Sequence, residues 1–365
     1  MPIKIGYLLG THEDWGGASR ALLNFVHSVD RNRFQPVVLV TKRGPLVDRL
    51  TSERIEWLVW AKHDRQRNLL GYALDVWRAA RFFREHALQV LHVNEGNIGW
   101  KPAEILAARL LRIPIIAHLH VATEHPSSFM RYSSVVVAVS QYVADHSDSM
   151  GAPKRVIHNI SDLARFGQGI DLRQELGYAN SDVIIAFLGQ MIRVKGLEMF
   201  IEVARRIDDS RARFVVAGPL RKTQGAYTEA EVNELVGRDS RIRYLGYRTD
   251  VENLYATSDI IVMPSQWDEP CAMVLFEAAA AGKPVVATAT GGTPEILRHE
   301  HTGFLVERDD VSGMTRYVAQ LIEDRGLRDR VGQEAALLAR RSLAVDPVRQ
   351  LEDLYVSLMG AGVAS

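Results

Sequence analysis

Two carboxylates stand eight positions apart in the segment WDEPCAMVLFEAAAAGKP, Glu269 before a proline and Glu277 inside an apolar, alanine-rich run. A helix that begins just after Pro270 places Glu277 about one turn beyond its first N–H groups. At ~1.5 Å per residue the two carboxylates span roughly 12 Å. This distance fits a diphosphate at the helix start, with a sugar facing Glu269 and a ribose facing Glu277. Alternatively, Glu277 has a partner within the protein, a backbone group or an arginine, because burying an unpaired charge costs roughly several kcal/mol.

Three further loops have a composition that suits an anionic ligand. The segment FLGQMIRVKGLEMF places Arg193 and Lys195 in a strand-to-helix connection, where cations and helix N–H groups favour phosphate. A solvated surface lysine explains this loop equally well. Gly218 ends the run VVAGPL, and Gly16 and Gly17 follow the first apolar run in THEDWGGASR. Glycines there let the backbone approach a ligand closely, although an ordinary tight turn is the simpler interpretation.

The elements that must hold these loops are short β-branched apolar runs alternating with segments of helical period. Fully apolar strands separated by helices indicate a parallel sheet covered on both faces, the doubly wound design. Strands are expected at residues 3–9, 36–40, 55–60, 90–93, 113–119 and 135–140, and again at 183–189, 213–218, 242–246, 259–265, 283–288 and 303–306. The polar stretch 156–182 between the two series is interpreted as a linker region. The sequence therefore predicts two similar α/β domains in tandem, residues 1–160 and 161–345.

Composition narrows the class of protein. The 365 residues include 44 basic and 44 acidic side chains, a balance unlike that of a general nucleic-acid-binding protein. A single cysteine, Cys271, excludes an internal disulfide framework and a cysteine zinc cluster. The first loop lacks the G-x-G-x-x-G fingerprint, and the chain has no P-loop motif. The sequence therefore predicts neither a dinucleotide site of the G-x-G-x-x-G type nor a P-loop nucleotide site.

The sequence also bears on where the protein works. The first ten residues do not resemble a signal peptide, and no apolar run approaches the roughly 20 residues of a membrane span. We therefore expect a cytoplasmic protein, at most peripheral at the inner face of a membrane. The segment DVWRAARFFREH, residues 75–86, mixes aromatic side chains with arginines in a way that is compatible with anionic lipid. An amphipathic helix with its arginines in water is the alternative.

The succession VVVAVSQYVAD, VIHNISD, FLGQMIRVKGLEMFI, VVAGPL and the long segment 244–297, which ends in GGTPEIL, resembles glycosyltransferase family 4. The resemblance is strong between residues 183 and 306 and weak between 40 and 110, and its most specific element is the E-x7-E pair of Glu269 and Glu277. It implies a retaining enzyme of GT-B architecture, with two Rossmann-like domains facing each other across a cleft. A C-terminal helix, residues 346–365, is expected to pack back on the first domain.

The resemblance also implies roles for individual residues. Lys195 is expected to hold the donor diphosphate and Glu277 to bind the ribose. Glu269 is expected to face the donor sugar, and His120 in IPIIAHLH to lie near the transferred sugar, so Glu269, His120 and Lys195 are the candidate catalytic residues. His118 is expected to point to the opposite face of the strand, as a core residue.

The expected donor-binding residues are Gly16, Gly17, Gln190, Arg193, Lys195, Gly218, Cys271, Ala272, Met273, Val274 and Glu277. Within this set, backbone N–H groups of Met273 and Val274 are expected to bind phosphate. Gln190 departs from the family pattern, which has an arginine there, and Arg193 is the candidate substitute. Neither a metal nor a cofactor is expected, because the cations and the helix start are aimed at the charge of the leaving phosphate.

Together these features predict transfer of a sugar from a nucleotide-diphospho-sugar, UDP-linked in our interpretation, to a hydroxyl of a glycan, glycolipid or small-molecule acceptor. Two alternatives stay open. One is a sugar-nucleotide epimerase or hydrolase of the same fold, which needs no acceptor. The other is a non-catalytic protein that binds nucleotide sugars without turnover.

Overall fold

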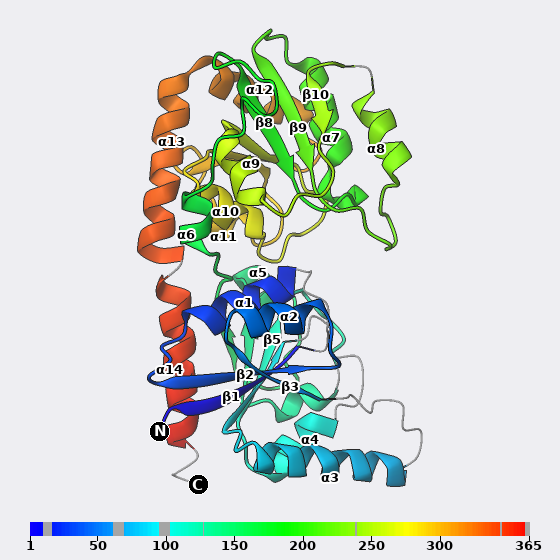
Figure 1. Ribbon diagram of the computed structural model, residues 1–365, viewed down its shortest axis with the longest axis vertical. Coiled ribbons are helices and arrows are strands. Elements are labelled where there is room, and N and C mark those ends of the chain that lie inside the picture. Colours follow the sequence, from blue (N-terminus) through cyan, green and yellow to red (C-terminus); the bar gives the residue numbers. More distant parts are fainter. Residues whose placement is uncertain are drawn as a thin grey trace. The chain divides into compact units, whose positions relative to one another are not determined.

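The computed structural model describes residues 1–9, 17–60, 69–94, 103–126, 128–237, 239–343 and 345–361. The chain divides into two compact units (Figure 1). Unit 1 consists of residues 1–160 with 346–365, and unit 2 of residues 161–345. Each unit is built around its own parallel sheet.

In unit 1 the described residues form a seven-stranded sheet in the order β3-β2-β1-β4-β5-β6-β7. Its strands are β1 (Ile3–Leu8), β2 (Phe34–Val40), β3 (Glu56–Val59), β4 (Val90–Asn94), β5 (Ile115–Leu119), β6 (Val135–Ala138) and β7 (Lys154–Val156). The helices are α1 (Gly17–Ser28), α2 (Pro45–Ser52), α3 (Leu69–Glu85), α4 (Ala103–Leu110), α5 (Gln141–Asp145) and α14 (Val345–Ala361). The strand order reverses between β1 and β4, and doubly wound sheets bind ligands at such a switch point.

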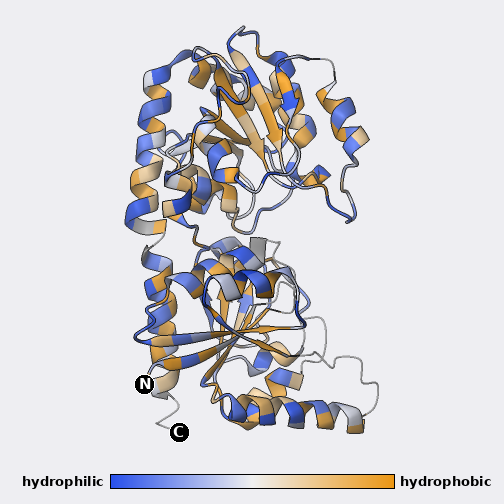
Figure 2. Ribbon diagram, in the orientation of Figure 1, coloured by the Kyte–Doolittle hydropathy of each residue, from blue (hydrophilic) through white to orange (hydrophobic). Residues whose placement is uncertain are grey.

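The sheet of unit 1 buries a separate apolar cluster on each face, because alternate strand residues point to opposite sides. Tyr7 and Val38 belong to the cluster that contains Leu22 and Phe25 of α1. Leu351 and Tyr355 of α14 belong to the same cluster, so the C-terminal helix packs on the core of unit 1. The other cluster contains residues of α3 and α4. In Figure 2 the strands stand out as apolar runs between helices of mixed polarity.

In unit 2 the described residues form a six-stranded parallel sheet in the order β10-β9-β8-β11-β12-β13. Its strands are β8 (Val183–Leu188), β9 (Ala212–Ala217), β10 (Ile242–Tyr244), β11 (Ile260–Met263), β12 (Val285–Thr288) and β13 (Gly303–Val306). The helices are α6 (Leu163–Gly167), α7 (Leu197–Arg206), α8 (Glu229–Val236), α9 (Val251–Thr257), α10 (Met273–Ala280), α11 (Thr293–Ile296), α12 (Val311–Glu323) and α13 (Arg325–Leu338). Here the switch point lies between β8 and β11.

The doubly wound prediction is confirmed for both units, since each expected apolar run contains a strand. Strand β7 is not predicted by the sequence. It has only three residues, and Lys154 and Arg155 are exposed at the edge of the sheet, so it lacks an apolar run. An edge strand of this kind is defined by pairing with β6 rather than by its own pattern.

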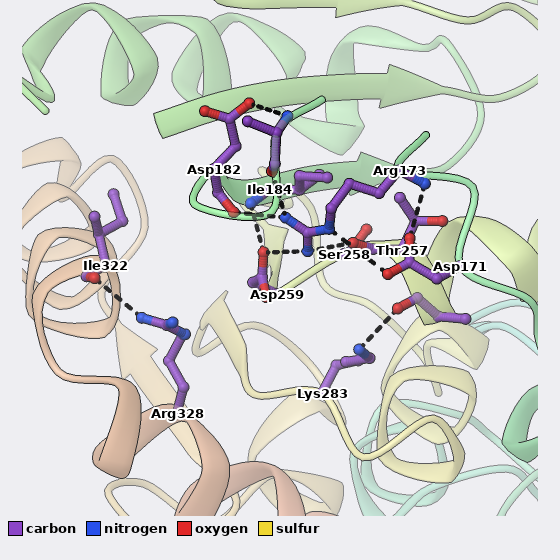
Figure 3. Close-up of polar contacts among 12 residues, drawn as sticks. Asp171, Arg173, Asp182, Ile184, Thr257, Ser258, Asp259, Lys283, Ile322 and Arg328 are labelled. Atoms are coloured by element: carbon purple, nitrogen blue, oxygen red, sulfur yellow. Dashed lines mark hydrogen bonds and ion pairs between the residues drawn. The ribbon is translucent and has the colours of Figure 1, made fainter. Parts of the chain in front are cut away.

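Most of the stretch expected to be a linker is part of unit 2. The guanidinium of Arg173 donates to Asp259 Oδ2 at 3.1 Å and to the carbonyl oxygen of Asp182 at 2.6 Å (Figure 3). Asp259 Oδ2 also accepts from the backbone N–H of Ile184 at 2.7 Å. These contacts join the segment to the amino ends of β8 and β11. The segment thereby holds the amino ends of β8 and β11, the two strands whose carboxyl ends form the switch point.

Candidate active site

The loops that follow β8 and β11 lie together at the switch point of unit 2. The first contains a short 3-10 turn, Arg193–Lys195, which ends at Gly196 with φ 78°. A Cβ at Gly196 would collide with the carbonyl oxygen of Pro264, just beyond β11. The backbone N–H of Gln266 also donates to the carbonyl oxygen of Val194 at 2.7 Å. Glycine is therefore required for the close approach that brings the lysine loop against the second loop.

Lys195 and Glu269 form an ion pair between these loops. Lys195 Nζ donates to Glu269 Oε1 at 2.6 Å, and Ser265 Oγ lies 2.6 Å from the same oxygen. Glu269 is only 3% exposed, and Lys195 Nζ also lies 5.1 Å from the ring centroid of Trp267. Within the described part of the chain no donor is bonded to Glu269 Oε2. The carboxylate is thus buried and oriented, with one oxygen left for a ligand.

The segment GGTPEIL, which precedes and forms α11, holds the backbone of Glu269. The N–H of Gly292 donates to the carbonyl oxygen of Glu269 at 2.7 Å. Gly291 has φ 54°, and a Cβ there would collide with the backbone of Glu269. At the end of β12, Thr288 Oγ1 donates to the carbonyl oxygen of Ser265 at 2.6 Å. The glycine pair therefore positions the backbone of Glu269, a role that the sequence does not assign to it.

Helix α10 begins at Met273, close to the predicted start after Pro270. Ala272 is its N-cap residue, no side chain caps the helix, and its first turn has no acidic residue. Among the described residues no side chain therefore caps the N–H groups at the helix start, and the first turn itself carries no carboxylate that would neutralise the partial positive charge of the helix end. Cys271 and Ala272 are buried, whereas Met273 and Val274 are partly exposed. This helix start has the properties of a phosphate-binding site.

Glu277 lies one turn into α10 and is 8% exposed. Its Oε2 accepts a hydrogen bond at 2.7 Å from the hydroxyl of Tyr255, a fully buried residue of α9. Glu277 therefore has a tyrosine hydroxyl as a partner within the protein. Tyr255 is not a sequence-predicted site residue, because in NLYATSD it has the spacing of an ordinary core residue of a helix. Its hydroxyl fixes the orientation of the Glu277 carboxylate.

Arg193 lies in the same turn as Lys195 but has different partners. Its guanidinium donates to Glu198 at 2.9 Å and to Glu231 at 2.7 Å, and it stacks over the ring of Tyr227 at 4.6 Å. These partners come from α7, from α8 and from the loop before α8. The two cations of the loop are therefore held by different groups, and Lys195 is the one that is paired at the switch point.

Two further predicted residues of unit 2, Gln190 and Gly218, lie at the carboxyl ends of β8 and β9. Gln190 is half-buried and follows Gly189 directly after β8. A Cβ at Gly218, at the end of β9, would collide with the carbonyl oxygen of Gly189. Close packing of the loops after β8 and β9 thus accounts for the glycine at 218.

In unit 1, His120 lies just beyond β5 and is 7% exposed. Its ring stacks on that of His118, with centroids 4.5 Å apart and planes inclined by 25°. The prediction that His118 points to the opposite face is wrong, because residues two apart on a strand share a face. Its assignment to the core is confirmed, since His118 is fully buried. Gly17 is the first residue of α1, and Gly16 lies outside the described residues.

Burial controls the charge of these histidines. Desolvation lowers the pKa of His120 to about 4, so its imidazole is neutral near pH 7. A neutral imidazole offers one donor and one acceptor to a ligand hydroxyl. Among the described residues, no group of three or more His, Cys, Asp or Glu side chains is arranged to bind a metal ion.

Solved structures identify the class to which this fold belongs. HepE of Anabaena, crystallised in complex with UDP, superposes with a TM-score of 0.81 over 97% of this chain and 100% of its own, at 23% identity. WaaG, a glycosyltransferase involved in lipopolysaccharide biosynthesis, superposes with a TM-score of 0.68 over 96% of this chain and 99% of its own, at 14% identity. The fold is that of the GT-B glycosyltransferases.

Family models match nearly the whole length of the chain. Residues 15–165 match "Glycosyltransferase Family 4" and residues 170–337 match "Glycosyl transferases group 1". The chain therefore belongs to glycosyltransferase family 4 and is a glycosyltransferase. A similar protein, the N-acetyl-alpha-D-glucosaminyl L-malate synthase of Bacillus anthracis, is 27% identical over 304 residues, which are 77% of this chain and 78% of the relative.

Proposed function

We propose that this glycosyltransferase uses a nucleoside-diphospho-sugar, UDP-linked, as its donor and that unit 2 binds it. The observation that carries the proposal is the ion pair of Lys195 with buried Glu269. This pair precedes the uncapped start of α10, and Glu277 lies one turn into that helix. The cation and the helix N–H groups match the diphosphate of such a donor. Of the two oriented carboxylates, Glu269 matches the sugar and Glu277 matches the ribose. The presence of UDP in the similar HepE structure supports this choice of donor.

Each side chain then has a distinct task. Lys195 and the N–H groups of Met273 and Val274 bind the diphosphate. Glu269 accepts a sugar hydroxyl on Oε2, while Oε1 stays bonded to Lys195 and Ser265. Glu277 accepts from the ribose hydroxyls, with its carboxylate oriented by Tyr255.

In the reaction the bond between the anomeric carbon and the phosphate oxygen breaks, and a bond to the acceptor oxygen forms. The acceptor hydroxyl loses its proton to the oxygen of the leaving diphosphate, which gains negative charge as the bond breaks. Lys195 and the start of α10 stabilise that charge without reorganising, which is the electrostatic part of catalysis. We propose that these groups make a metal ion unnecessary and that the anomeric configuration is retained. His120, as a neutral imidazole, contacts a hydroxyl of the transferred sugar.

The acceptor in this proposal is a hydroxyl of a glycan, glycolipid or small molecule, and the reaction takes place in the cytoplasm. None of the described helices is long and apolar enough to cross a membrane. Peripheral contact is supported by α3, where Leu69 and Leu70 are each 85% exposed and Trp77 is 56% exposed. Arg81 lies over the Trp77 ring at 5.7 Å. Exposed apolar side chains next to a cation are typical of helices that lie on anionic lipid.

A donor screen tests the proposal most directly. Thermal shifts with UDP-, GDP-, ADP- and dTDP-sugars identify the base, and UDP-sugars are expected to stabilise the protein most. The best donor is then incubated with and without acceptor, in the presence of EDTA. Consumption of donor without acceptor indicates an epimerase or hydrolase, and binding without consumption indicates a non-catalytic protein. Loss of transfer in EDTA, or a product of inverted anomeric configuration by NMR, would contradict the corresponding part of the proposal.

Membrane contact is tested separately by sedimentation with vesicles that contain anionic lipid. Wild-type protein is expected to sediment with them, and Trp77→Ser to sediment less. Leu110→Ser serves as the matched control, because Leu110 is 66% exposed but lies on α4. Equal sedimentation of all three proteins would argue for an α3 that is simply solvated.

A further inference from the structure

A continuous line of hydrogen-bonded, buried polar side chains crosses the core of unit 1 and ends at His118, on which the ring of His120 stacks. Tyr7 Oη lies 2.8 Å from Tyr355 Oη, and Tyr355 Oη lies 2.8 Å from His92 Nδ1. His92 Nε2 lies 3.1 Å from His118 Nδ1. We call Tyr7, Tyr355, His92 and His118 the polar chain; they come from β1, α14, β4 and β5, and all four are fully buried.

Burial keeps every member of the polar chain neutral near pH 7. Desolvation raises the pKa of both tyrosines above the usual value. It lowers the pKa of His92 to about 3 and that of His118 well below the usual range. A neutral phenol and a neutral imidazole each carry a single proton to donate. The hydrogen bonds must therefore all run in the same direction along the chain.

The two directions leave different groups without a partner. If the bonds run from His118 towards Tyr7, the Tyr7 hydroxyl is a donor with no acceptor among the described residues. If they run from Tyr7 towards His118, Tyr7 donates to Tyr355, Tyr355 to His92 Nδ1, and His92 Nε2 to His118 Nδ1. In either case His118 Nε2 has no partner within the described part of the chain. The second direction leaves one polar group unsatisfied instead of two, and buried unsatisfied groups are costly.

This direction fixes the tautomer of His118. Its Nδ1 accepts from His92, so its single proton is on Nε2. The hydrogen bond also holds the ring plane of His118, on which the His120 ring stacks with centroids 4.5 Å apart. His120 itself lies at the carboxyl end of β5, and doubly wound domains bind ligands at the carboxyl ends of their strands.

We propose that Tyr355, His92 and His118 are positioning residues for the transfer reaction: hydrogen bonds that start at α14 fix the ring of His118, which holds the imidazole of His120 in place by stacking. The proposal rests on the proposed function, in which His120 contacts the transferred sugar. The C-terminal helix thus has a role in the chemistry of unit 1 in addition to its apolar packing.

Two matched substitutions test the direction and the role together. Tyr355→Phe removes the donor to His92 and allows His92 to take either tautomer. Tyr7→Phe removes a hydroxyl of the same kind from the same buried cluster, but Tyr355 still donates to His92. For Tyr355→Phe we expect kcat about tenfold lower with an unchanged KM for the donor, because misplacement of a catalytic group lowers the rate. For Tyr7→Phe we expect kcat within about twofold of wild type.

A purely structural role gives a different pattern. Both variants would then lose thermal stability to a similar extent, and their kcat values would change equally or not at all. Either kinetic result overturns the proposal. Thermal unfolding of both variants is measured in parallel, so that a loss of folded protein is not mistaken for a loss of turnover.

Nitrogen NMR of the histidine side chains provides a measurement that needs no variant and no turnover. In wild-type protein labelled with ¹⁵N-histidine, His118 is expected to show a protonated Nε2 and an unprotonated Nδ1. Tyr7→Phe should preserve this signature, and Tyr355→Phe should produce a mixture of tautomers at His92. A protonated Nδ1 on His118 in an active wild-type protein overturns the inference. Absence of transfer with every donor instead overturns the proposed function, whatever the tautomer.

Discussion

Replacing Lys195 with methionine separates the charge of the ion pair from the packing around it. Methionine keeps an unbranched apolar stem beside Trp267 but removes the ammonium group. The Glu269 carboxylate, 3% exposed, then retains only the hydroxyl of Ser265 as a donor to Oε1 among the described residues. Breaking a buried pair in this way costs roughly 3–5 kcal/mol, because a charge stays buried without compensation. We expect the free energy of unfolding to fall by about 3 kcal/mol, because the hydroxyl of Ser265 still donates to the Glu269 carboxylate.

The reverse substitution should be milder. In Glu269→Gln the Lys195 ammonium, with 24% of its side chain exposed, reaches water, and the amide oxygen still accepts from Ser265. A loss of about 1 kcal/mol is expected. The double variant carries no buried charge at this position, so it should be more stable than Lys195→Met by roughly 2 kcal/mol.

Thermal and urea unfolding of unit 2 measure these differences. For a domain of this size each kcal/mol shifts Tm by roughly 2–4 °C, so Lys195→Met should unfold about 6–12 °C lower. Arg193→Met is the matched control in the same turn; its guanidinium is half exposed, and its ion pairs should be worth at most about 1 kcal/mol. If the double variant is no more stable than Lys195→Met, Glu269 is not the buried partner described here. The assignment of Oε2 to a ligand would then lose its basis.

Three further predictions concern binding and stability. Glu277→Ala should weaken UDP and UDP-sugar alike by about ten- to a hundredfold, whereas Glu269→Ala should leave UDP affinity nearly unchanged and lower turnover; calorimetry beside a transfer assay decides, and equal weakening of UDP would contradict the division. A folded fragment of residues 161–345 should retain UDP affinity by calorimetry, and a folded fragment without affinity would contradict donor binding by unit 2. The buried His92, His118 and His120 have lowered pKa values, so the unfolded chain binds more protons and stability should fall as pH drops from about 6 towards 4, by up to about 4 kcal/mol per pH unit. Urea unfolding at several pH values checks this, and a pH-independent midpoint for unit 1 would contradict it.

Local pattern determined much of the fold and part of the site. Apolar β-branched runs of strand length are readable because both faces of a parallel sheet are buried. The start of α10 is readable because proline and the apolar run that follows set its first turn. Lys195 and Glu269 were both predicted as site residues from their loops and from the family resemblance. Their direct contact depends on the order of strands, which places β8 beside β11 although 71 residues separate Leu188, the end of β8, from Ile260, the start of β11.

The residues that sequence reasoning missed support the site from a distance in the chain. Tyr255 has the spacing of a helix core residue, and its hydroxyl becomes meaningful only when α9 packs beside α10. His92 in VLHV and Tyr355 in the last helix likewise fit apolar patterns in which one polar atom is easily overlooked. Such contacts depend on which elements pack together, and periodicity predicts only which face of an element is buried.

The two units share a topology but place opposite kinds of polar groups at their switch points. In unit 2 the loops after β8 and β11 carry a full positive and a full negative charge, each stabilised by the other. In unit 1 burial keeps His120 neutral, with a pKa of about 4, and keeps the histidines behind it neutral as well. Full charges suit a diphosphate, whose own charge offsets their desolvation, whereas neutral imidazoles suit hydroxyl groups. If the proposed function holds, the charged groups of unit 2 bind the donor phosphate and the neutral imidazole of unit 1 contacts the sugar. This difference follows from which side chains each sheet buries, and the same doubly wound fold serves both purposes.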